Sequence, residues 1–381
     1  MKTFDIAVVG GGASGLTAAI SAKRADINAS VAVIEKLPRV GKKILSTGNG
    51  RCNLSNRNIG EEHYHARSKE LLKYTSGFSA EAFFRSVGVL CTADEEERIY
   101  PGSFSAASVL DALRLEGAKL GVQEICECPV TDIIPSDGRF VISGSEQITA
   151  RSVIIAGGGS SQSSLGSDGS ALEICRSLGI KINRIYPVLT PLKTDAAKTG
   201  ALKGQRIRAE VSIITGGKTL GSEYGEVQFG DGVISGICVL DLSYLAEKNN
   251  SELSLDLLPE MSYEETLSLL KEISIVRADA ALEDFLSGIT GKRVGIFILK
   301  RCVDKPLSER VSSLTDNELR SITSQLKSLR CPVTGISGFE KSQATGGGID
   351  ISEITPELGS KRYSGMFFCG EILDIFGDCG G

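Results

Sequence analysis

The chain lacks the features that mark several common protein classes. Basic residues are not in excess, since 42 Lys and Arg stand beside 47 Asp and Glu in 381 residues, a formal net charge of -5. This balance gives no electrostatic reason to expect nucleic-acid or membrane-surface partners. No apolar run approaches the roughly 20 residues of a membrane span, and the N-terminus does not read as a secretory signal. We therefore expect a cytoplasmic protein.

Paired cysteines and histidines are also scarce. The ten cysteines form no C-x-x-C pair, and the nearest spacing is Cys126-x-Cys128, so we expect reduced thiols and disfavour a dithiol reductase or an iron–sulfur protein. The two histidines, His63 and His65, lie in a polar stretch where a solvated loop is favoured over a metal site. Serine nucleophile elbow, H-E-x-x-H and Walker A motifs are absent too. The sequence therefore predicts no metal and leaves the catalytic residues unknown.

The segments that are present begin with a strand–helix–strand pattern. The apolar run Phe4–Val9 predicts a buried parallel strand, Ala13–Arg24 a helix, and Ser30–Glu35 a second buried strand. Such a unit has a right-handed crossover. Two further buried strands are predicted at 152–156 and 366–371. Signals of a parallel sheet therefore lie in both the N-terminal and the C-terminal parts of the chain.

The middle of the chain follows a different pattern. Residues 190–245 alternate in the manner of strands, and helical periodicity follows them. Two capping boxes, Ser262-x-x-Glu265 and Thr315-x-x-Glu318, precede helical segments. Because parallel-sheet signals flank this region, the sequence predicts a discontinuous α/β domain with an insertion. The predicted bounds are 1–190 and 332–381 for the α/β domain and 191–331 for the insertion, with a β part at about 191–250 and a helical part at about 260–330.

A glycine fingerprint joins the first strand to the first helix. Gly10-x-Gly12-x-x-Gly15 permits a tight turn, close approach of the backbone to a pyrophosphate, and close packing of helix on strand. The helix N-terminus attracts phosphate. Glu35, about twenty residues further on at the end of the second strand, can accept hydrogen bonds from a ribose, and its charge argues against a 2′-phosphate. These features together predict a bound dinucleotide.

Two other features favour FAD over NAD. A second glycine cluster follows the strand at 152–156, where a backbone turn can close over the nucleotide. The C-terminal strand ends in Gly370-Glu371, which can place a carboxylate on a ribitol hydroxyl. A simple nicotinamide dehydrogenase has no ribitol to hold, so the sequence favours a flavin.

The segment GKKILSTGNGRCNLSN, residues 41–56, is rich in groups that can contact a ligand. It begins shortly after the second strand, at the sheet edge where doubly wound folds bind ligands, so we predict that it wraps the flavin. Lys42, Lys43 and Arg51 suit phosphate oxygens or the flavin edge where negative charge develops. For Cys52 a small packed residue is favoured. The alternative is a reactive thiolate whose pKa is lowered by the neighbouring arginine.

Several motifs, in order and over nearly the whole chain, resemble the HI0933-like (YhiN-type) flavoproteins, which include BaiN-type and aminoacetone-oxidase-like proteins. This resemblance implies a Rossmann-like FAD-binding domain of the glutathione-reductase type with an inserted β-barrel-like and helical domain. The motifs are VVGGGASGLTAAI at 8–20, IEK at 34–36, residues 41–56, IIAGGGSSQSSLGSDGSALEI at 154–174, GEVQFGDGVISGICVLDLS at 225–243, QATGGGIDISEI at 343–354 and FFCGEILDIFGDCGG at 367–381.

The resemblance also implies a set of cofactor-binding residues. The fingerprint would hold the ADP half, Val130 would lie near the adenine, and Gly370 with Glu371 would serve the ribitol and pyrophosphate. The stretch 345–347 would lie near the flavin ring. The full predicted set is Gly10, Gly12, Ala13, Ser14, Gly15, Glu35, Lys36, Lys43, Asn49, Gly50, Arg51, Cys52, Asn53, Val130, Ala156, Gly157, Gly158, Thr345, Gly346, Gly347, Gly370, Glu371, Gly380 and Gly381.

These observations predict an FAD-dependent oxidoreductase that acts on a small organic substrate through the flavin ring. The chain has one full dinucleotide fingerprint, so NAD(P)H is left open as a transient electron donor. The oligomeric state is not indicated. Two alternatives are a flavin-binding redox sensor without turnover and a tRNA-modification-like flavoprotein, which the net charge of -5 disfavours.

Overall fold

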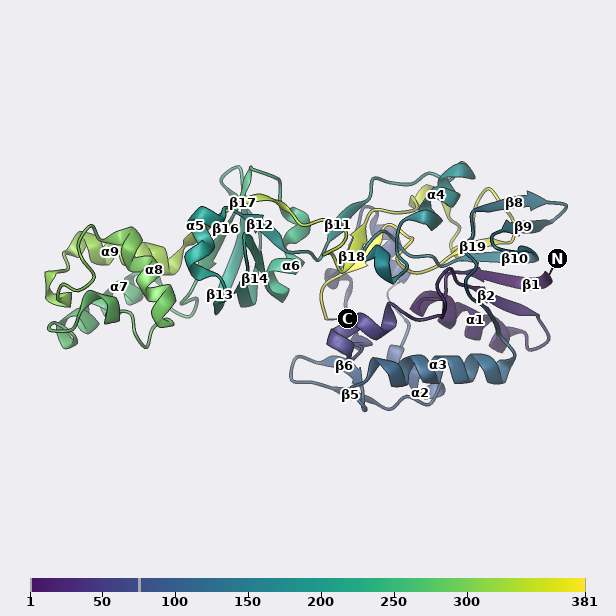
Figure 1. Ribbon diagram of the computed structural model, residues 1–381, viewed down its shortest axis with the longest axis horizontal. Helices are drawn as coiled ribbons and strands as arrows, with labels where there is room; N and C mark the ends of the chain where they lie inside the picture. The colour runs from purple at the N-terminus through teal and green to yellow at the C-terminus, as the bar shows by residue number, and fades with distance from the viewer. Residues whose placement is uncertain (1, 75–76, 381) are drawn as a thin grey trace. The chain divides into compact units, whose positions relative to one another are not determined.

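The computed structural model describes residues 2–74 and 77–380. The chain divides into two compact units (Figure 1). The first unit runs to Pro187 and resumes at Ser342, and the inserted unit is Val188–Lys341. Across the described residues, no helix is both long and apolar enough to cross a bilayer.

A seven-stranded sheet organises the first unit. Its path is β7-β2-β1-β10-β9-β8, and β19 also pairs with β10. The pairs β1–β2, β1–β10, β2–β7 and β10–β19 are parallel, whereas β9 and β8 continue the sheet antiparallel. The strands are β1 (Lys2–Val9), β2 (Val31–Ile34), β7 (Gln123–Ile125), β8 (Asp132–Ser136), β9 (Arg139–Ser143), β10 (Gln147–Ile155) and β19 (Met366–Phe368).

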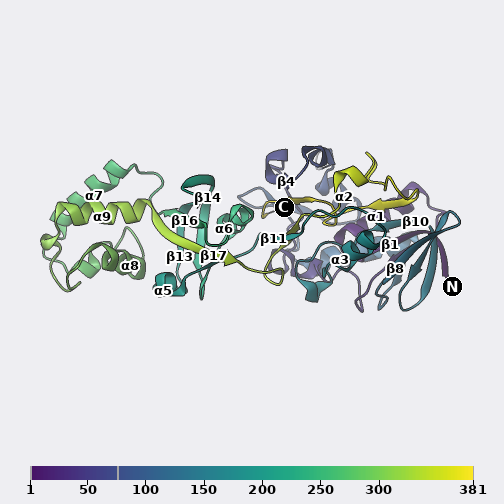
Figure 2. The ribbon, with the colours of Figure 1, turned by 90° about the horizontal axis from the view of Figure 1, so that it is seen from above.

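Helices cover both faces of this sheet. Figure 1 shows α1 (Ala13–Ala25) and α3 (Ala106–Leu120) on one side and α4 (Ser170–Ser177) on the other, and Figure 2 gives the view from above. Because neighbouring strand residues point to opposite faces, Val8 packs in the core beneath α1 while Val9 packs in the core on the other face. The sheet is therefore buried on both sides, which is why its strands read as continuous apolar runs.

Shorter elements surround the sheet of the first unit. A 3₁₀ segment follows β2 along the chain, and β20, from the C-terminal part, pairs with β4. A small sheet has the order β3-β6-β5. These elements are the 3₁₀ segment Ile44–Gly50, β3 (Ser55–Asn56), β4 (Tyr64–Ala66), α2 (Ala80–Ser86), β5 (Cys91–Ala93), β6 (Arg98–Pro101), β11 (Tyr186–Val188), β18 (Ala344–Gly346) and β20 (Ile375–Gly377).

The predicted strand–helix–strand unit is confirmed, with β1, α1 and β2 in the predicted order. The strand predicted at 152–156 is longer than expected. β10 begins at Gln147, because its first residues pair with the antiparallel β9 rather than with a parallel neighbour alone. The C-terminal strand is shorter than predicted and ends at Phe368, where the chain turns towards the sheet edge that carries the glycine clusters.

The inserted unit contains a closed barrel with the strand order β12-β15-β14-β13-β16-β17. The prediction of a barrel-like insertion with helices is confirmed. The last strand, β17, closes the barrel, so the chain leaves this unit later than the predicted position 331. The strands are β12 (Leu192–Thr194), β13 (Arg206–Thr215), β14 (Lys218–Phe229), β15 (Val233–Ser235), β16 (Ser251–Asp256) and β17 (Leu329–Ile336).

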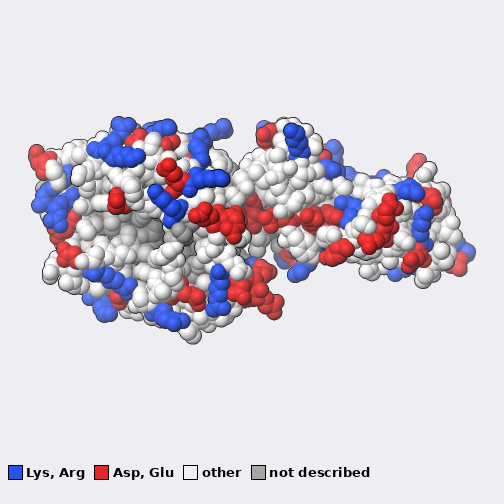
Figure 3. Space-filling view, turned by 180° about the vertical axis from the view of Figure 1, so that it is seen from behind, with Lys and Arg blue, Asp and Glu red and all other residues white. Residues whose placement is uncertain are grey.

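Helices complete the inserted unit, and both predicted capping boxes are present. Ser262 Oγ accepts a hydrogen bond from the Glu265 N–H at 3.2 Å, and the Glu265 carboxylate accepts from the Ser262 N–H at 2.7 Å. On the face drawn in Figure 3, acidic and basic side chains are interspersed on both units. The helices are α5 (Ala196–Thr199), α6 (Ile237–Asp241), α7 (Tyr263–Val276), α8 (Lys292–Cys302) and α9 (Asp316–Lys327).

The close packing of α1 on β1 depends on Gly15, because a Cβ there would overlap the Gly10 carbonyl oxygen. We expect Gly15→Ala to lower the free energy of unfolding by about 1–3 kcal/mol or more, the usual cost of overpacking. Gly117→Ala in α3 is the matched control, since its Cβ would only touch Val122 at 3.8 Å. Chemical denaturation should show little loss, or a gain of up to about 1 kcal/mol, for the control. Equal stability of the two variants would contradict this account.

Candidate functional site

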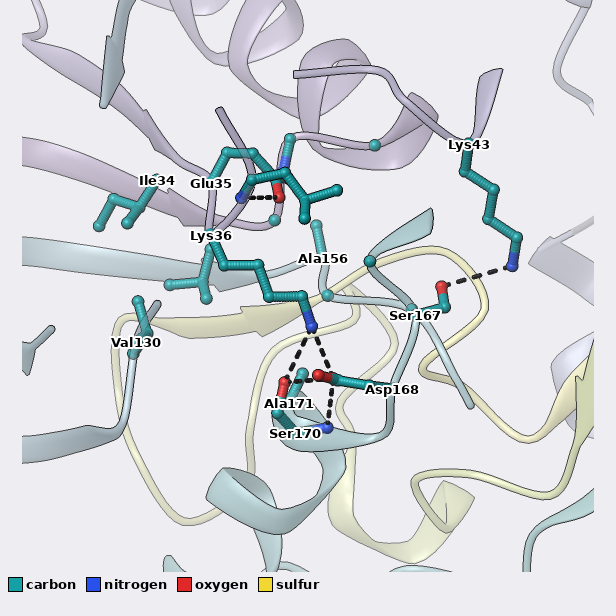
Figure 4. Close-up of a pocket in the computed structure, with 18 of the residues that line it drawn as sticks. Ile34, Glu35, Lys36, Lys43, Val130, Ala156, Ser167, Asp168, Ser170 and Ala171 are labelled. Atoms are coloured by element: carbon teal, nitrogen blue, oxygen red, sulfur yellow. Dashed lines mark hydrogen bonds and ion pairs between the residues drawn. The ribbon is translucent and has the colours of Figure 1, made fainter. Parts of the chain in front are cut away.

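A cavity of about 890 Å³ opens at the carboxyl ends of β1, β2 and β10 in the first unit. This is the sheet edge at which doubly wound folds bind ligands, and the volume is within the range of cofactor sites. Figure 4 shows some of the residues that line it. The residues of the predicted set that line it are Gly10, Gly12, Ala13, Ser14, Glu35, Lys36, Lys43, Val130, Ala156, Gly157, Gly158, Gly370 and Glu371.

The glycines of the fingerprint have two different physical roles. Gly10 has φ +109°, and a Cβ on it would lie 2.6 Å from the Ala156 carbonyl oxygen, so packing within the protein requires glycine there. Gly12 differs, because no described atom lies within 4 Å of the position its Cβ would take. The empty space beside Gly12 belongs to the cavity rather than to the protein core. A glycine that the protein's own packing does not require fits the close approach of a ligand.

The start of α1 is arranged to receive an anion. Among the described residues, no side chain caps this helix, and its first turn contains no acidic residue. The first N–H groups of a helix have no partner within the helix and carry its positive dipole end. Since Gly12, Ala13 and Ser14 all line the cavity, these N–H groups can hydrogen-bond a pyrophosphate.

Glu35 follows β2 and is held in one orientation by backbone donors. Its Oε2 accepts a hydrogen bond from the Gly11 N–H at 2.8 Å, and its Oε1 accepts from the Leu37 N–H at 2.9 Å. The residue is 8% exposed. A carboxylate has about four lone-pair sites, so both oxygens retain capacity for ribose hydroxyls. Gly11 was not in the predicted set of cofactor-binding residues. Packing favours glycine there, because a Cβ on it would lie 2.7 Å from the Val40 side chain.

Two lysines extend over the cavity and form ion pairs with residues far away in sequence. Lys36 Nζ donates to Asp168 Oδ1 at 2.6 Å and to Ser170 Oγ at 3.3 Å, as Figure 4 shows. Burial opposes ionisation of Asp168, but the hydrogen bonds from Lys36 and Ser170 outweigh it and lower the pKa of the carboxyl. Lys43 Nζ donates to Glu371 Oε2 at 3.0 Å. These pairs fix the charges that face a ligand.

The far wall of the cavity contains residues that sequence reasoning missed. Ser167, Asp168 and Ser170 come from the Ser/Gly-rich stretch 157–170, which ends with the first residue of α4. Lys42, which the sequence did indicate, donates from its Nζ to the Ser164 carbonyl at 3.0 Å. The biased composition of that stretch was the available signal, but composition alone does not distinguish a cavity wall from a surface loop.

The segment 41–56 is divided between the cavity and the body of the unit. Its first part, including Lys43 and Thr47, lines the cavity. Asn49, Gly50, Arg51, Cys52 and Asn53, which we predicted as cofactor contacts, do not line it. The Arg51 guanidinium instead lies 5.3 Å from the centroid of the Tyr100 ring. Contact between these five residues and a cofactor stays a prediction.

The favoured interpretation of Cys52 is confirmed, and the reactive-thiolate alternative is wrong. Cys52 is 5% exposed and belongs to the core beneath α1. Burial raises the pKa of its thiol, and a hydrogen bond with Thr47 offsets only part of that rise. The guanidinium of Arg51 points to Tyr100, so the neighbouring charge does not counteract burial.

The predicted 345–347 stretch lies behind Glu371 rather than on the cavity wall. The Thr345 N–H donates to Glu371 Oε1 at 2.7 Å, and its Oγ1 accepts from the Ser160 N–H at 2.8 Å. Gly346 is buried, and a Cβ on Gly347 would overlap the Arg184 carbonyl oxygen. Gly15 is likewise buried beneath the fingerprint turn. These glycines support the site by packing.

Gly380 lines a separate cavity of about 290 Å³ with His63 and Asp378. His63 is exposed, as expected for a solvated loop, whereas His65 is half-buried in β4, and Asp378 contacts both histidines. His63 Nδ1 lies 3.1 Å from Asp378 Oδ2, and His65 Nε2 lies 2.6 Å from Asp378 Oδ1. Within the described ranges, no group of three or more metal-ligating side chains is present. Gly381 lies outside the described residues.

The Gly12 position separates cofactor binding from folding. We expect Gly12→Ala to weaken FAD binding by at least about tenfold, the equivalent of about 1.4 kcal/mol, because its methyl group would enter the cavity. The melting temperature of the cofactor-free protein should not change. Gly200→Ala is the control, since its Cβ would also face open space but in the inserted unit. Titration of cofactor-free protein with FAD measures the difference, and equal affinities would contradict the assignment.

Arg51 tests whether the second part of segment 41–56 contacts a bound cofactor. If it does, Arg51→Ala will weaken FAD retention and leave the unfolding midpoint nearly unchanged, because the side chain is exposed. Arg57→Ala removes a similar cation that pairs with Glu81 at 3.5 Å and serves as the control. Unchanged flavin release from the Arg51 variant would restrict the cofactor contacts to the first part of the segment.

Comparison with known proteins identifies the family of this chain. The HI0933-like protein Rossmann domain model matches residues 4–381. The 3-dehydro-bile acid delta(4,6)-reductase of Clostridium scindens is 34% identical, over 99% of this chain and 94% of that protein. The ribosomal RNA dihydrouridine synthase of Haemophilus influenzae is 26% identical, over 98% of this chain and 93% of that protein.

A solved structure shares the fold. The E. coli quinol fumarate reductase subunit FrdA superposes with a TM-score of 0.50 at 16% identity, covering 98% of this chain and 66% of that chain. The predictions of an FAD-binding Rossmann fold and of a flavin-dependent oxidoreductase are confirmed by the family match and the curated relatives. The chain therefore belongs to the HI0933-like family.

Proposed function

We propose that this protein binds FAD in the 890 Å³ cavity and uses it to reduce a carbon–carbon double bond that is conjugated to a carbonyl group. The observation that carries cofactor binding is the open space at Gly12 beside the uncapped start of α1, with the Glu35 carboxylate held nearby. The residues present fit the ADP half of FAD in charge and in shape. The acidic Glu35 does not suit a 2′-phosphate.

The type of bond is inferred from the two curated relatives. One is named for reduction at the 4,6 positions of a 3-dehydro bile acid, and the other for making dihydrouridine in ribosomal RNA. A 3-oxo-4-ene steroid and a uracil ring share a C=C bond polarised by a neighbouring carbonyl. A reduced flavin, when bound, supplies a hydride to the carbon β to the carbonyl, and a proton from solvent at the α carbon completes the reduction.

The residues of this chain have binding and positioning roles in that reaction. The N–H groups at the start of α1 hold the pyrophosphate, and Glu35 accepts from the ribose hydroxyls. Lys43, at the cavity wall and paired with Glu371, supplies positive charge next to an anionic ligand. The electron donor that we propose is NAD(P)H. Because the sequence carries one full dinucleotide fingerprint, which FAD occupies in this proposal, the nicotinamide would reach the flavin only transiently.

Two substrate classes carry the proposed bond, and they differ in charge. A small unsaturated ketone is apolar, whereas a uracil base in RNA brings a chain of phosphates. The small molecule is the class we expected from sequence. The alternative function, a flavin-binding redox sensor without turnover, predicts bound flavin that no substrate reoxidises.

Anaerobic stopped-flow absorbance tests the proposal. We expect purified protein to carry FAD, to lose its absorbance near 450 nm when mixed with NADH or NADPH, and to regain it with a conjugated enone or with uridine-containing RNA, each reoxidation proceeding as about one equivalent of the C=C bond is reduced. A saturated ketone and RNA without uridine serve as unreactive controls. Flavin that is reduced but never reoxidised by either substrate class would favour the sensor. A protein that refuses added FAD would overturn the proposal.

A further inference from the structure

A second cleft, of about 540 Å³, lies within the inserted unit. It runs between α8 and the segment that contains α5. Four basic side chains line it: Lys198, Arg293, Lys300 and Arg301. The remaining wall is apolar, with Ile296 and Phe297 half-buried and two alanines opposite them. No acidic residue lines this cleft in the part of the chain that the structure describes.

The positive charge of the cleft is not neutralised by the protein. Within residues 2–74 and 77–380, none of the four basic side chains forms an ion pair, although carboxylates outnumber cations in the sequence. The neighbouring Lys292 shows the contrast, because it lies 3.1 Å from Asp284. Like charges gathered in one concave surface repel each other and raise the local concentration of anions. Such a cluster suits a ligand that brings the missing negative charge.

The spacing of the charges indicates a ligand longer than one phosphate. Arg293, Ile296, Phe297 and Lys300 follow one face of α8 at positions i, i+3, i+4 and i+7. At 1.5 Å per residue, the two cations lie about 10 Å apart along the helix axis. One phosphate cannot contact both. The apolar pair between them instead fits the sugar or base that separates phosphates in a nucleic-acid strand.

The ring of Phe297 holds the Arg301 side chain in one orientation at the cleft. The Arg301 guanidinium lies 4.8 Å from the centroid of the Phe297 ring. Cation–π contact restricts the guanidinium, so less rotamer freedom is lost when it binds an anion. Planar guanidinium groups also suit the paired oxygens of a phosphodiester.

We propose that this cleft binds the phosphate backbone of single-stranded RNA. The proposal deepens the proposed function and rests on it, because it selects a uracil base in RNA as the substrate class over a small unsaturated ketone. A ketone offers no repeated negative charge for the four cations. An acidic polypeptide offers charge but not the alternation of charge with flat rings that matches the apolar middle of the cleft.

The proposal differs from the expectation drawn from net charge. A formal charge of -5 describes the whole chain, whereas binding of a phosphate strand depends on cations gathered at one place. The acidic residues of the inserted unit lie elsewhere than on the walls of the cleft.

Fluorescence anisotropy with a labelled, uridine-containing single-stranded RNA of about 20 nucleotides tests the cleft. The full-length flavin-loaded protein is titrated at several salt concentrations. We expect Arg293→Glu/Lys300→Glu to weaken binding at least tenfold. The slope of log K against log salt should fall in magnitude by about 1.4, for two lost phosphate contacts at about 0.7 each.

Lys218→Glu/Lys248→Glu is the matched control, because it makes a like change of net charge at exposed lysines of the same unit outside the cleft. It should bind RNA as the wild type does, apart from a small uniform weakening. Both double variants should keep the flavin absorbance of the wild type, which checks folding. Failure of the wild type to bind RNA, equal loss in both variants, or equally tight binding of polyglutamate would each overturn the proposal.

The outcomes also separate this proposal from the proposed function. RNA that binds at the cleft but leaves reduced flavin unoxidised would refute reduction of the RNA base while the cleft assignment stands. Reoxidation by a conjugated enone, with no RNA binding, would refute the cleft assignment while the flavin reaction stands. Reoxidation by RNA that is lost in the Arg293→Glu/Lys300→Glu variant and kept in the control would support both.

Discussion

The close approach of three backbone segments at one edge of the sheet is the constraint on which the site depends. The turn after β1 passes so near the end of β10 that a side chain on Gly10 would press on Ala156. The helix behind it, α1, packs on the same turn through Gly15. A Cβ on Gly370 would lie 2.6 Å from Ser14 Oγ, so glycine is needed where the C-terminal segment approaches α1. Because glycine fills each close contact, the backbone itself forms the cavity floor, and α1 begins with its N–H groups facing open space.

The parts of the structure that local chemistry specifies could be predicted from the sequence. Apolar runs ending in glycine identified β1 and β10, and serine or threonine three residues before glutamate located the starts of α7 and α9. The ion pairs of the site could not be predicted in this way. Lys36 and Asp168 are 132 residues apart, and Lys43 and Glu371 are 328 apart. Each lysine has many carboxylates within its reach in principle, and the fold alone selects one.

The segment 41–56 shows why a motif rich in functional groups predicts less than its composition suggests. Its lysines reach the cavity, but the chain then turns through positive φ at Asn49 and Cys52. That turn directs Cys52 into the core and leaves Arg51 on the ring of Tyr100. A short segment can thus place alternate parts of one motif in a ligand site and in a packed core. Residue type does not separate the two, because lysine, arginine and asparagine serve both ligands and backbone carbonyls.

The net charge of the whole sequence did not indicate where charged side chains gather in the structure. The first unit neutralises the cations around its cavity with partners such as Asp168 and Glu371, so the charges there are fixed before a ligand arrives. The cleft beside α8 does the opposite and leaves its cations without carboxylate partners in the described chain. A paired cation orients a ligand at little cost in desolvation. An unpaired cluster of cations attracts an anionic ligand, and salt weakens that attraction. The two proposals therefore assign different tasks to the two sites, precise placement of a cofactor in one and capture of a charged strand in the other.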